Sequence, residues 1–167
     1  MVRVYKITDK DGYTRRNQPE ETLWGENITH KAEGRGKTLC SNQVIHCYKD
    51  PYLAVFMNPT HGNYDTKTML LWEAKGRIIA DDKTKSGCKT LTTIKKIPVP
   101  QFTTEQLVEI AIRCAMKVYT DEVFQEWAAW AAGAGATAGP TARAAAEAAT
   151  GTAGNFDLVS IIREVIK

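Results

Sequence analysis

The pattern of the sequence changes at the stretch Ile97-Pro98-Val99-Pro100-Gln101-Phe102-Thr103-Thr104-Glu105-Gln106-Leu107. Two prolines end an extended segment here, because proline cannot donate a hydrogen bond to a strand partner. Thr103 and Gln106 then have the spacing of a capping box, which starts a helix. The sequence therefore predicts an α+β protein: a small, mainly antiparallel β-rich half over residues 1–100 and an Ala-rich helical half over residues 101–167.

Upstream of this stretch, the residues favour strands. Residues 2–7 alternate between apolar and polar side chains, and Asp9-Lys10-Asp11-Gly12 is typical of a turn. Further strands are predicted over residues 44–48, 68–74, 77–80 and 91–97, with Lys75-Gly76 as a hairpin turn between the 68–74 and 77–80 strands. Asp50-Pro51 predicts a short helix over residues 52–57, which Asn58-Pro59 would end.

Downstream, apolar residues recur at helical spacing from Leu107 to Val118. A second helix is predicted from Asp121 to Ala132, and residues 128–153 contain 14 alanines. Pro140 can begin a third helix and Gly151 can end it. We expect Asn155 to cap a last amphipathic helix.

The charge is uneven along the chain. The composition is that of a globular protein, with 43% apolar and 25% charged residues and a net charge of +3. Residues 1–100 contain 17 Lys and Arg against 11 Asp and Glu, whereas residues 101–167 contain 5 against 8. All three histidines also lie in the first half. The net charge is too small to imply a partner, but an asymmetry of this kind between segments bears on which partners each half contacts.

Targeting signals and cysteines predict the compartment. Charged residues are spread through the first ten positions, so the apolar core of a signal peptide cannot form there. No run of 18 apolar residues, the length of a transmembrane helix, occurs in the sequence. These features predict a cytoplasmic protein with no membrane contact. In that compartment we expect the four cysteines to be free thiols, mostly buried.

Candidate binding residues fall into a basic group and an aromatic pair. The basic group has serine and threonine neighbours, which suits contacts to phosphate, and consists of Arg77, Lys83, Lys85, Lys89, Lys95 and Lys96. The alternative is a solvated hairpin edge, where lysine discourages edge-to-edge pairing. Trp127 and Trp130 lie on one helix face, which fits core packing, partner binding or a homodimer interface.

Sites for metals, cofactors and catalysis are less well marked. Cys40, His46, Cys47, His61 and Cys88 are zinc-type ligands, but no Cys-x-x-Cys pair occurs, and adjacent residues such as His46 and Cys47 point to opposite faces of a strand. We predict no metal and no cofactor. For nucleophilic catalysis, the best-placed candidate pair is Cys47 as the nucleophile and His61 as its base. The loop at residues 33–38 lacks the spacing of a phosphate-binding P-loop, and no catalytic residue is assigned.

Two stretches resemble a loose group of uncharacterised phage and prophage accessory proteins. In the first half they are His46-Cys47 followed by Asp50-Pro51, and Glu73-Ala74-Lys75-Gly76-Arg77-Ile78. In the second half they are residues 103–115, then Trp127-Ala128-Ala129-Trp130 and the alanine repeats. The resemblance implies a phage setting, in which small accessory proteins often act on host defences.

The first half also resembles ADP-ribosyltransferase-type folds. The likeness rests on Leu39–Ser41, the Asp50–Ala54 helix start and the strand Thr68–Glu73. Tyr5, Ser41 and Glu73 are the nearest matches to the three motif positions of that family. The resemblance implies binding of NAD or another nucleotide.

These observations lead to one preferred function and two alternatives. We expect a non-enzymatic phage accessory protein, of the anti-CRISPR kind, that binds a host defence effector complex made of protein or ribonucleoprotein in the host cytoplasm. A nucleotide-binding or NAD-binding, ADP-ribosyltransferase-like enzyme is the first alternative. A purely structural oligomerising protein is the second.

Overall fold

A computed structural model describes residues 1–117, 122 and 156–167 of the chain. It divides into two compact units, Met1–Pro100 and Gln101–Lys167. The first contains an antiparallel sheet and the second contains helices, so the chain has the α+β composition that the sequence predicts. The helices expected between Asp121 and Gly151 lie outside the described residues, as do Trp127 and Trp130.

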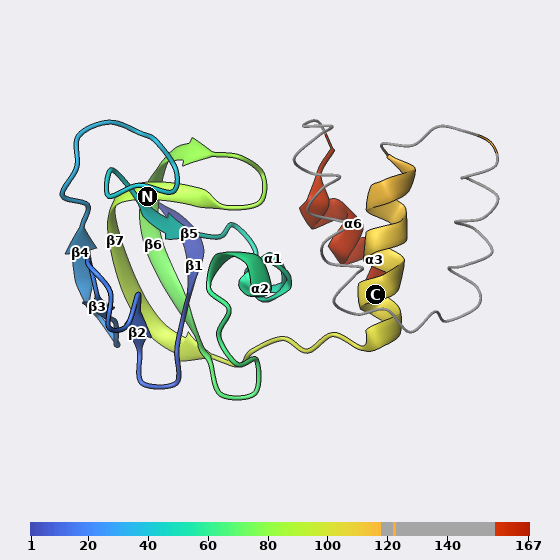
Figure 1. The fold of residues 1–167 in the computed structure, drawn as a ribbon, viewed down its shortest axis with the longest axis horizontal. Helices are drawn as coiled ribbons and strands as arrows, with labels where there is room; N and C mark the ends of the chain where they lie inside the picture. The colour runs from blue at the N-terminus through green and yellow to red at the C-terminus, as the bar shows by residue number, and fades with distance from the viewer. Residues whose placement is uncertain (118–121, 123–155) are drawn as a thin grey trace. The chain divides into compact units, whose positions relative to one another are not determined.

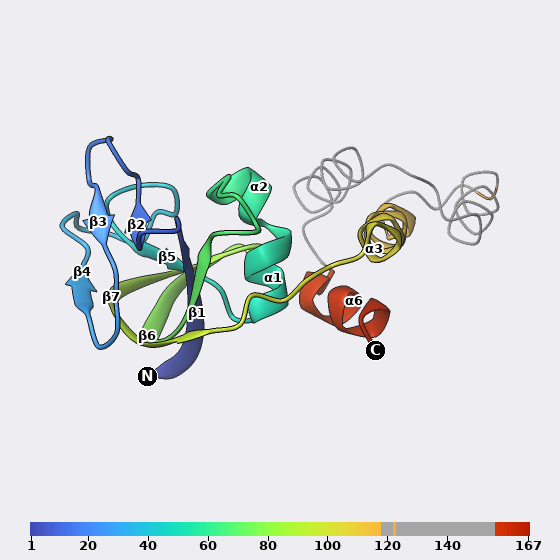
Figure 2. The same ribbon diagram turned by 90° about the horizontal axis from the view of Figure 1, so that it is seen from below.

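One five-stranded antiparallel sheet organises the first unit (Figures 1 and 2). Its strands are β1 (Val2–Thr8), β4 (Thr29–Lys31), β5 (Ile45–Cys47), β6 (Leu70–Asp81) and β7 (Ser86–Ile97). The order is β1-β6-β7-β4, and β5 also pairs with β7, at Ser86–Cys88. A small second sheet is formed by β2 (Tyr13–Thr14) and β3 (Thr22–Leu23).

The main sheet curls until its two sides meet. Tyr48, directly after β5, forms a bridge with Tyr5 on β1, with backbone N–H···O distances of 2.9 and 2.8 Å. The path β1–β6–β7–β5 thereby returns to β1. Inside the curl lies an apolar cluster of six buried residues, Val4, Trp24, Cys47, Ala74, Cys88 and Leu91.

The β6–β7 hairpin differs from the sequence prediction. Gly76 is not in a turn, because β6 continues through it to Asp81. A Cβ at Gly76 would lie 2.7 Å from Cys88 Sγ and 3.2 Å from Leu91 Cδ1, so the core requires glycine here. The turn lies instead at Asp82–Lys85, where Asp82 Oδ1 accepts the N–H groups of Thr84 and Lys85 at 2.9 and 2.8 Å.

Two short helices follow β5, and the first of them lies beside β1 (Figures 1 and 2). The predicted cap at Asp50 is confirmed: its carboxylate accepts the N–H groups of Tyr52 and Leu53 and starts α1 (Pro51–Phe56). Asn58-Pro59 ends α1 but also begins α2 (Asn58–His61). Leu53, Ala54, Val55 and Phe56 of α1 are buried.

The second unit contains α3 (Thr104–Met116) and α6 (Leu158–Val165). The capping box of Thr103 and Gln106 is confirmed at the start of α3. Arg113 of α3 bonds Glu109 at 2.6 Å and Glu164 of α6 at 3.1 Å, which joins the two helices. Asn155, the predicted cap, lies outside the described residues, and the carboxylate of Asp157 accepts the first free N–H groups of α6.

Three of the four cysteines are buried, and Cys40 is exposed. Among the described residues, no helix is long and apolar enough to cross a membrane.

Candidate functional site

The six basic residues of the predicted group do not form one exposed strip. Lys89 Nζ donates to the carbonyl oxygens of Gly34 and Gln43, each at 2.6 Å, and so fastens the 34–43 loop to β7. The side chain of Lys85 is only 11% exposed and contacts His61 and Asp82. The exposed members are Arg77, Lys83, Lys95 and Lys96. Lys95 faces Glu73 across the β6–β7 ladder, and Glu73 also pairs with Arg3.

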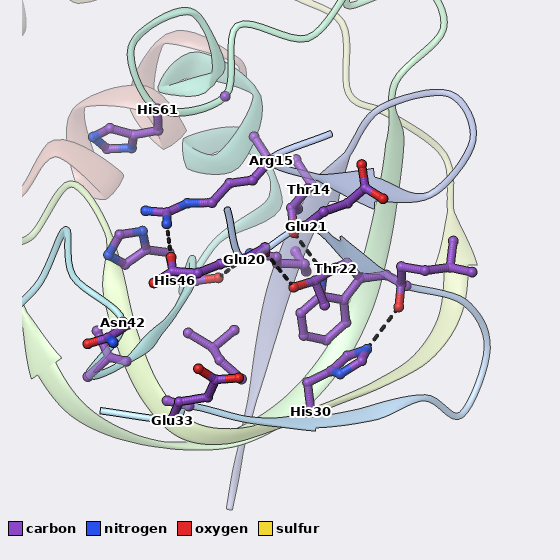
Figure 3. Close-up of a pocket in the computed structure, with 18 of the residues that line it drawn as sticks. Thr14, Arg15, Glu20, Glu21, Thr22, His30, Glu33, Asn42, His46 and His61 are labelled. Carbon is purple, nitrogen blue, oxygen red and sulfur yellow. Dashed lines mark hydrogen bonds and ion pairs between the residues drawn. The ribbon is translucent and has the colours of Figure 1, made fainter. Parts of the chain in front are cut away.

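A cleft of about 420 Å³ lies in the first unit (Figure 3). Its walls come from β1, β3, β4 and β5, from the loops that join β2 to β3 and β4 to β5, and from the end of α2. This volume is within the range of clefts that hold small molecules. Figure 3 shows His46 and His61 on one side of the cleft and His30 on the other.

Lys6 of β1 is a buried cation in the wall of this cleft. Its side chain shares the inner face of β1 with Val4, and the residue is 9% exposed. Its Nζ donates to the carbonyl oxygen of His46 at 2.9 Å and lies 5.3 Å from the centre of the Trp24 ring. No carboxylate of the described residues pairs with it. Burial lowers the pKa of Lys6 to about 8, and the positive charge of Arg15 acts in the same direction.

His46 of β5 lines the cleft and lies within the electrostatic reach of Lys6, Lys85 and Arg15. Its Nε2 accepts the backbone N–H of Cys40 at 2.8 Å, so the ring proton of the neutral form is on Nδ1. Burial, together with the nearby charges of Lys6 and Lys85, lowers the pKa of His46 to about 4. His46 is therefore neutral at physiological pH and has an Nδ1–H to donate.

His61, at the end of α2, contacts Tyr48, which also lines the cleft, and Lys85, which does not. Its Nδ1 lies 3.1 Å from the hydroxyl of Tyr48, and its Nε2 lies 3.2 Å from Lys85 Nζ. The rings of His61 and Tyr48 are stacked, with centres 6.0 Å apart. Burial raises the pKa of the Tyr48 hydroxyl, which keeps it protonated.

Trp24 and His30 form a fixed aromatic corner. Their rings meet edge to face at 4.7 Å. Trp24 Nε1–H donates to Thr14 Oγ1 at 3.1 Å, and His30 Nε2 bonds the carbonyl oxygen of Leu23 at 2.8 Å. These bonds hold both rings in one orientation in the wall of the cleft.

Three carboxylates line the cleft: Glu20 and Glu21 of the β2–β3 loop, and Glu33 of the β4–β5 loop. Arg15 is paired with Glu20, as Figure 3 shows, so this cation and this carboxylate neutralise each other. Arg15, Asn17 and Glu20 all have positive φ angles, of 55°, 60° and 69°. Each non-glycine residue with a positive φ angle costs conformational energy, so surrounding contacts must hold this short loop in one shape.

The structure separates the residues that match the ADP-ribosyltransferase motif. Tyr5 and Glu73 face each other between β1 and β6, on the face opposite Lys6, and neither lines the cleft. Ser41 does line it, but its Oγ bonds within its own loop, to Thr38 O at 2.8 Å and Gln43 N at 3.2 Å. The three positions are therefore not brought together.

The Cys47–His61 pair is also not formed. Cys47 is fully buried, with its Sγ 3.6 Å from Cys88 Sγ. The hydrogen bond with Cys88 and burial both raise the pKa of the Cys47 thiol, which opposes formation of a thiolate. His61 contacts Tyr48 and Lys85 instead. Within the described part of the chain, no three His, Cys, Asp or Glu side chains are grouped to hold a metal ion.

Sequence reasoning did not single out Lys6 as a site residue. The available signal was its position, because a lysine two residues after Val4 in an alternating strand lies on the apolar face.

Comparison of the chain with protein-family models, curated proteins and solved structures gave no match.

Proposed function

We propose that the unit Met1–Pro100 binds a nucleotide in the cleft. The observation that carries this proposal is Lys6, a buried ammonium group in the cleft wall that no described carboxylate neutralises. Burying a charge without a partner is costly. An anionic ligand in the cleft would supply the missing counter-charge.

The other charges in and near the cleft support a phosphate-bearing ligand. Lys6, Lys85 and Arg15 all act electrostatically on His46. Glu20 neutralises Arg15, and Asp82 approaches Lys85 only to 3.8 Å. Lys6 therefore keeps a positive charge that no carboxylate neutralises beside His46, and phosphate oxygens accept hydrogen bonds from ammonium and imidazole N–H groups.

The aromatic corner supports a ligand with a planar, apolar part. His30 lies in the wall away from His61 (Figure 3), and the Trp24 ring meets it edge to face. A nucleotide has such a part, its base, joined to a phosphate group. NAD belongs to the same class. The proposal concerns binding and not transfer, because Glu73 lies on the other face of the sheet.

A thermal-unfolding screen of the full chain tests this proposal. The panel contains AMP, ADP, ATP, GTP and NAD, with adenosine and inorganic phosphate as partial ligands. A ligand at 100 times its Kd adds about 2.7 kcal/mol to the free energy of unfolding, which is a measurable rise in Tm. We expect a nucleotide to raise the Tm of the wild type and of Lys96→Met, an exposed control, by similar amounts, and to raise that of Lys6→Met distinctly less. No rise with any nucleotide would contradict the proposal.

The phage resemblance supports a second proposal, that the protein acts by binding a host defence complex. The described residues available for such contact include Arg77, Lys95 and Lys96, which are exposed on β6 and β7. Co-purification of tagged protein with a host effector, and plaque formation on defended hosts, test it.

The predicted homodimer through the Ala-rich helices concerns residues outside the described ranges.

A further inference from the structure

Three side chains form a hydrogen-bonded chain whose direction is fixed by its first member. Lys85 Nζ lies 3.2 Å from His61 Nε2, and His61 Nδ1 lies 3.1 Å from Tyr48 Oη. An ammonium group has only donors, so Nε2 must accept. The proton of the neutral imidazole is then on Nδ1, and Nδ1–H donates to Tyr48 Oη.

This direction leaves the hydroxyl proton of Tyr48 without an acceptor. The oxygen already accepts from His61, so its own O–H must donate elsewhere. Tyr48 is only 3% exposed, and no other residue in the described part of the chain accepts this proton. Leaving a buried donor without an acceptor is costly, and Tyr48 lines the cleft, where a ligand can supply one.

We infer that Tyr48 donates a hydrogen bond to a phosphoryl oxygen of the ligand in the cleft, and that Lys85 and His61 are positioning residues that turn its O–H toward that oxygen. The inference rests on the proposed nucleotide binding and adds which group recognises the phosphate. Phosphoryl oxygens suit this position because they only accept. The raised pKa of Tyr48 keeps the phenol protonated when a negative charge arrives.

Calorimetric titration with ADP gives the first readout. Tyr48→Phe removes only the hydroxyl, and Tyr5→Phe is the matched control, because Tyr5 is the bridge partner of Tyr48 but does not line the cleft. Loss of a hydrogen bond to a charged oxygen should weaken ADP binding roughly ten-fold or more in Tyr48→Phe. Tyr5→Phe should bind ADP as the wild type does. Equal affinity of Tyr48→Phe and wild type would overturn the inference and leave nucleotide binding intact.

Nuclear magnetic resonance of the full chain gives a readout that a merely structural role would not move. With histidine labelled with ¹⁵N, we expect His61 to be the Nδ1–H tautomer in the wild type. In Lys85→Met the donor to Nε2 is gone, so Tyr48 can donate to Nδ1, and we expect the Nε2–H tautomer with an ADP affinity as low as that of Tyr48→Phe. An Nε2–H tautomer in the wild type would overturn the inference.

Inorganic pyrophosphate separates the two possible failures. If ADP does not bind, the proposed function fails, and the ¹³Cζ resonance of Tyr48 is then followed during titration with pyrophosphate. A shift of that resonance supports phosphate recognition by Tyr48 without a nucleotide. No shift with ADP or pyrophosphate overturns the inference as well.

Discussion

Lys6 Nζ donates a hydrogen bond to the carbonyl oxygen of His46 across 2.9 Å, and so ties β1 to β5 beside the Tyr5–Tyr48 bridge. The two residues are 40 positions apart in sequence. The closure of the curled sheet brings them together at the wall of the cleft, where the ammonium group of Lys6 is buried. The buried charge and the closed sheet are therefore linked features.

The pH dependence of stability should show the cost of burying Lys6. Its pKa is about 8 in the folded state against 10.5 for an ordinary lysine, so the unfolded chain binds more protons between these values. Stability therefore rises with pH through this window. We expect the free energy of unfolding of the wild type to gain about 3 kcal/mol between pH 8 and 10.5, relative to Lys6→Met. Urea unfolding of both proteins across this range measures the difference, and parallel curves would contradict it.

Gly76 should tolerate no side chain. The Cβ of Gly76→Ala would lie 2.7 Å from Cys88 Sγ in the packed core, which should lower the free energy of unfolding by about 2 kcal/mol. In the double variant Gly76→Ala/Cys88→Ala the clashing sulfur is absent, so part of the loss should be recovered. A double-mutant cycle by urea unfolding measures this coupling. Additive losses would show that the contact with Cys88 is not the cause.

The Asp50 cap should contribute measurably to α1. Its carboxylate accepts the N–H groups of Tyr52 and Leu53, so Asp50→Ala should cost about 1 kcal/mol of unfolding free energy. Asp50→Asn keeps an accepting oxygen and should cost less. Thermal unfolding of both variants checks this order, and an equal loss in both would contradict a capping role.

Salt dependence should tell whether Lys95 and Lys96 contact nucleic acid. Each phosphate contact adds a slope of roughly −0.7 to −0.9 to log K against log salt. If both lysines bind phosphate, Lys95→Gln/Lys96→Gln should weaken nucleic-acid binding at all sequences and flatten the slope by about two units at most. Lys10→Gln/Lys67→Gln, which removes the same charge from exposed loop positions, should leave the slope unchanged. A flat response in the wild type would exclude the contact.

Features set by neighbouring residues could be predicted from the sequence. The capping box of Thr103 and Gln106 and the cap at Asp50 each depend on a spacing of two or three residues. The antiparallel first half followed from period-two alternation, as in β1. Local signals therefore gave the fold class and several element boundaries.

Features that depend on distant contacts could not be predicted. Lys75-Gly76 has the local composition of a turn, but contact with Cys88 explains the glycine within a continuous strand. The internal bonds of Lys89 reach residues 46 and 55 positions away. The cleft likewise combines β1, the β2–β3 loop, β5 and α2, which no short stretch of sequence brings together.

Calorimetric titration of the full chain with ADP, for the wild type, Lys6→Met and Lys96→Met, tests most directly whether Lys6 holds a nucleotide in the cleft. Removing the charged partner of a bound phosphate costs about 1.5–3 kcal/mol, which is at least a ten-fold loss of affinity. The account predicts one ADP bound per chain in the wild type and in Lys96→Met, and at least ten-fold weaker binding in Lys6→Met. Equal ADP affinity in all three proteins, or no binding to the wild type, would contradict it.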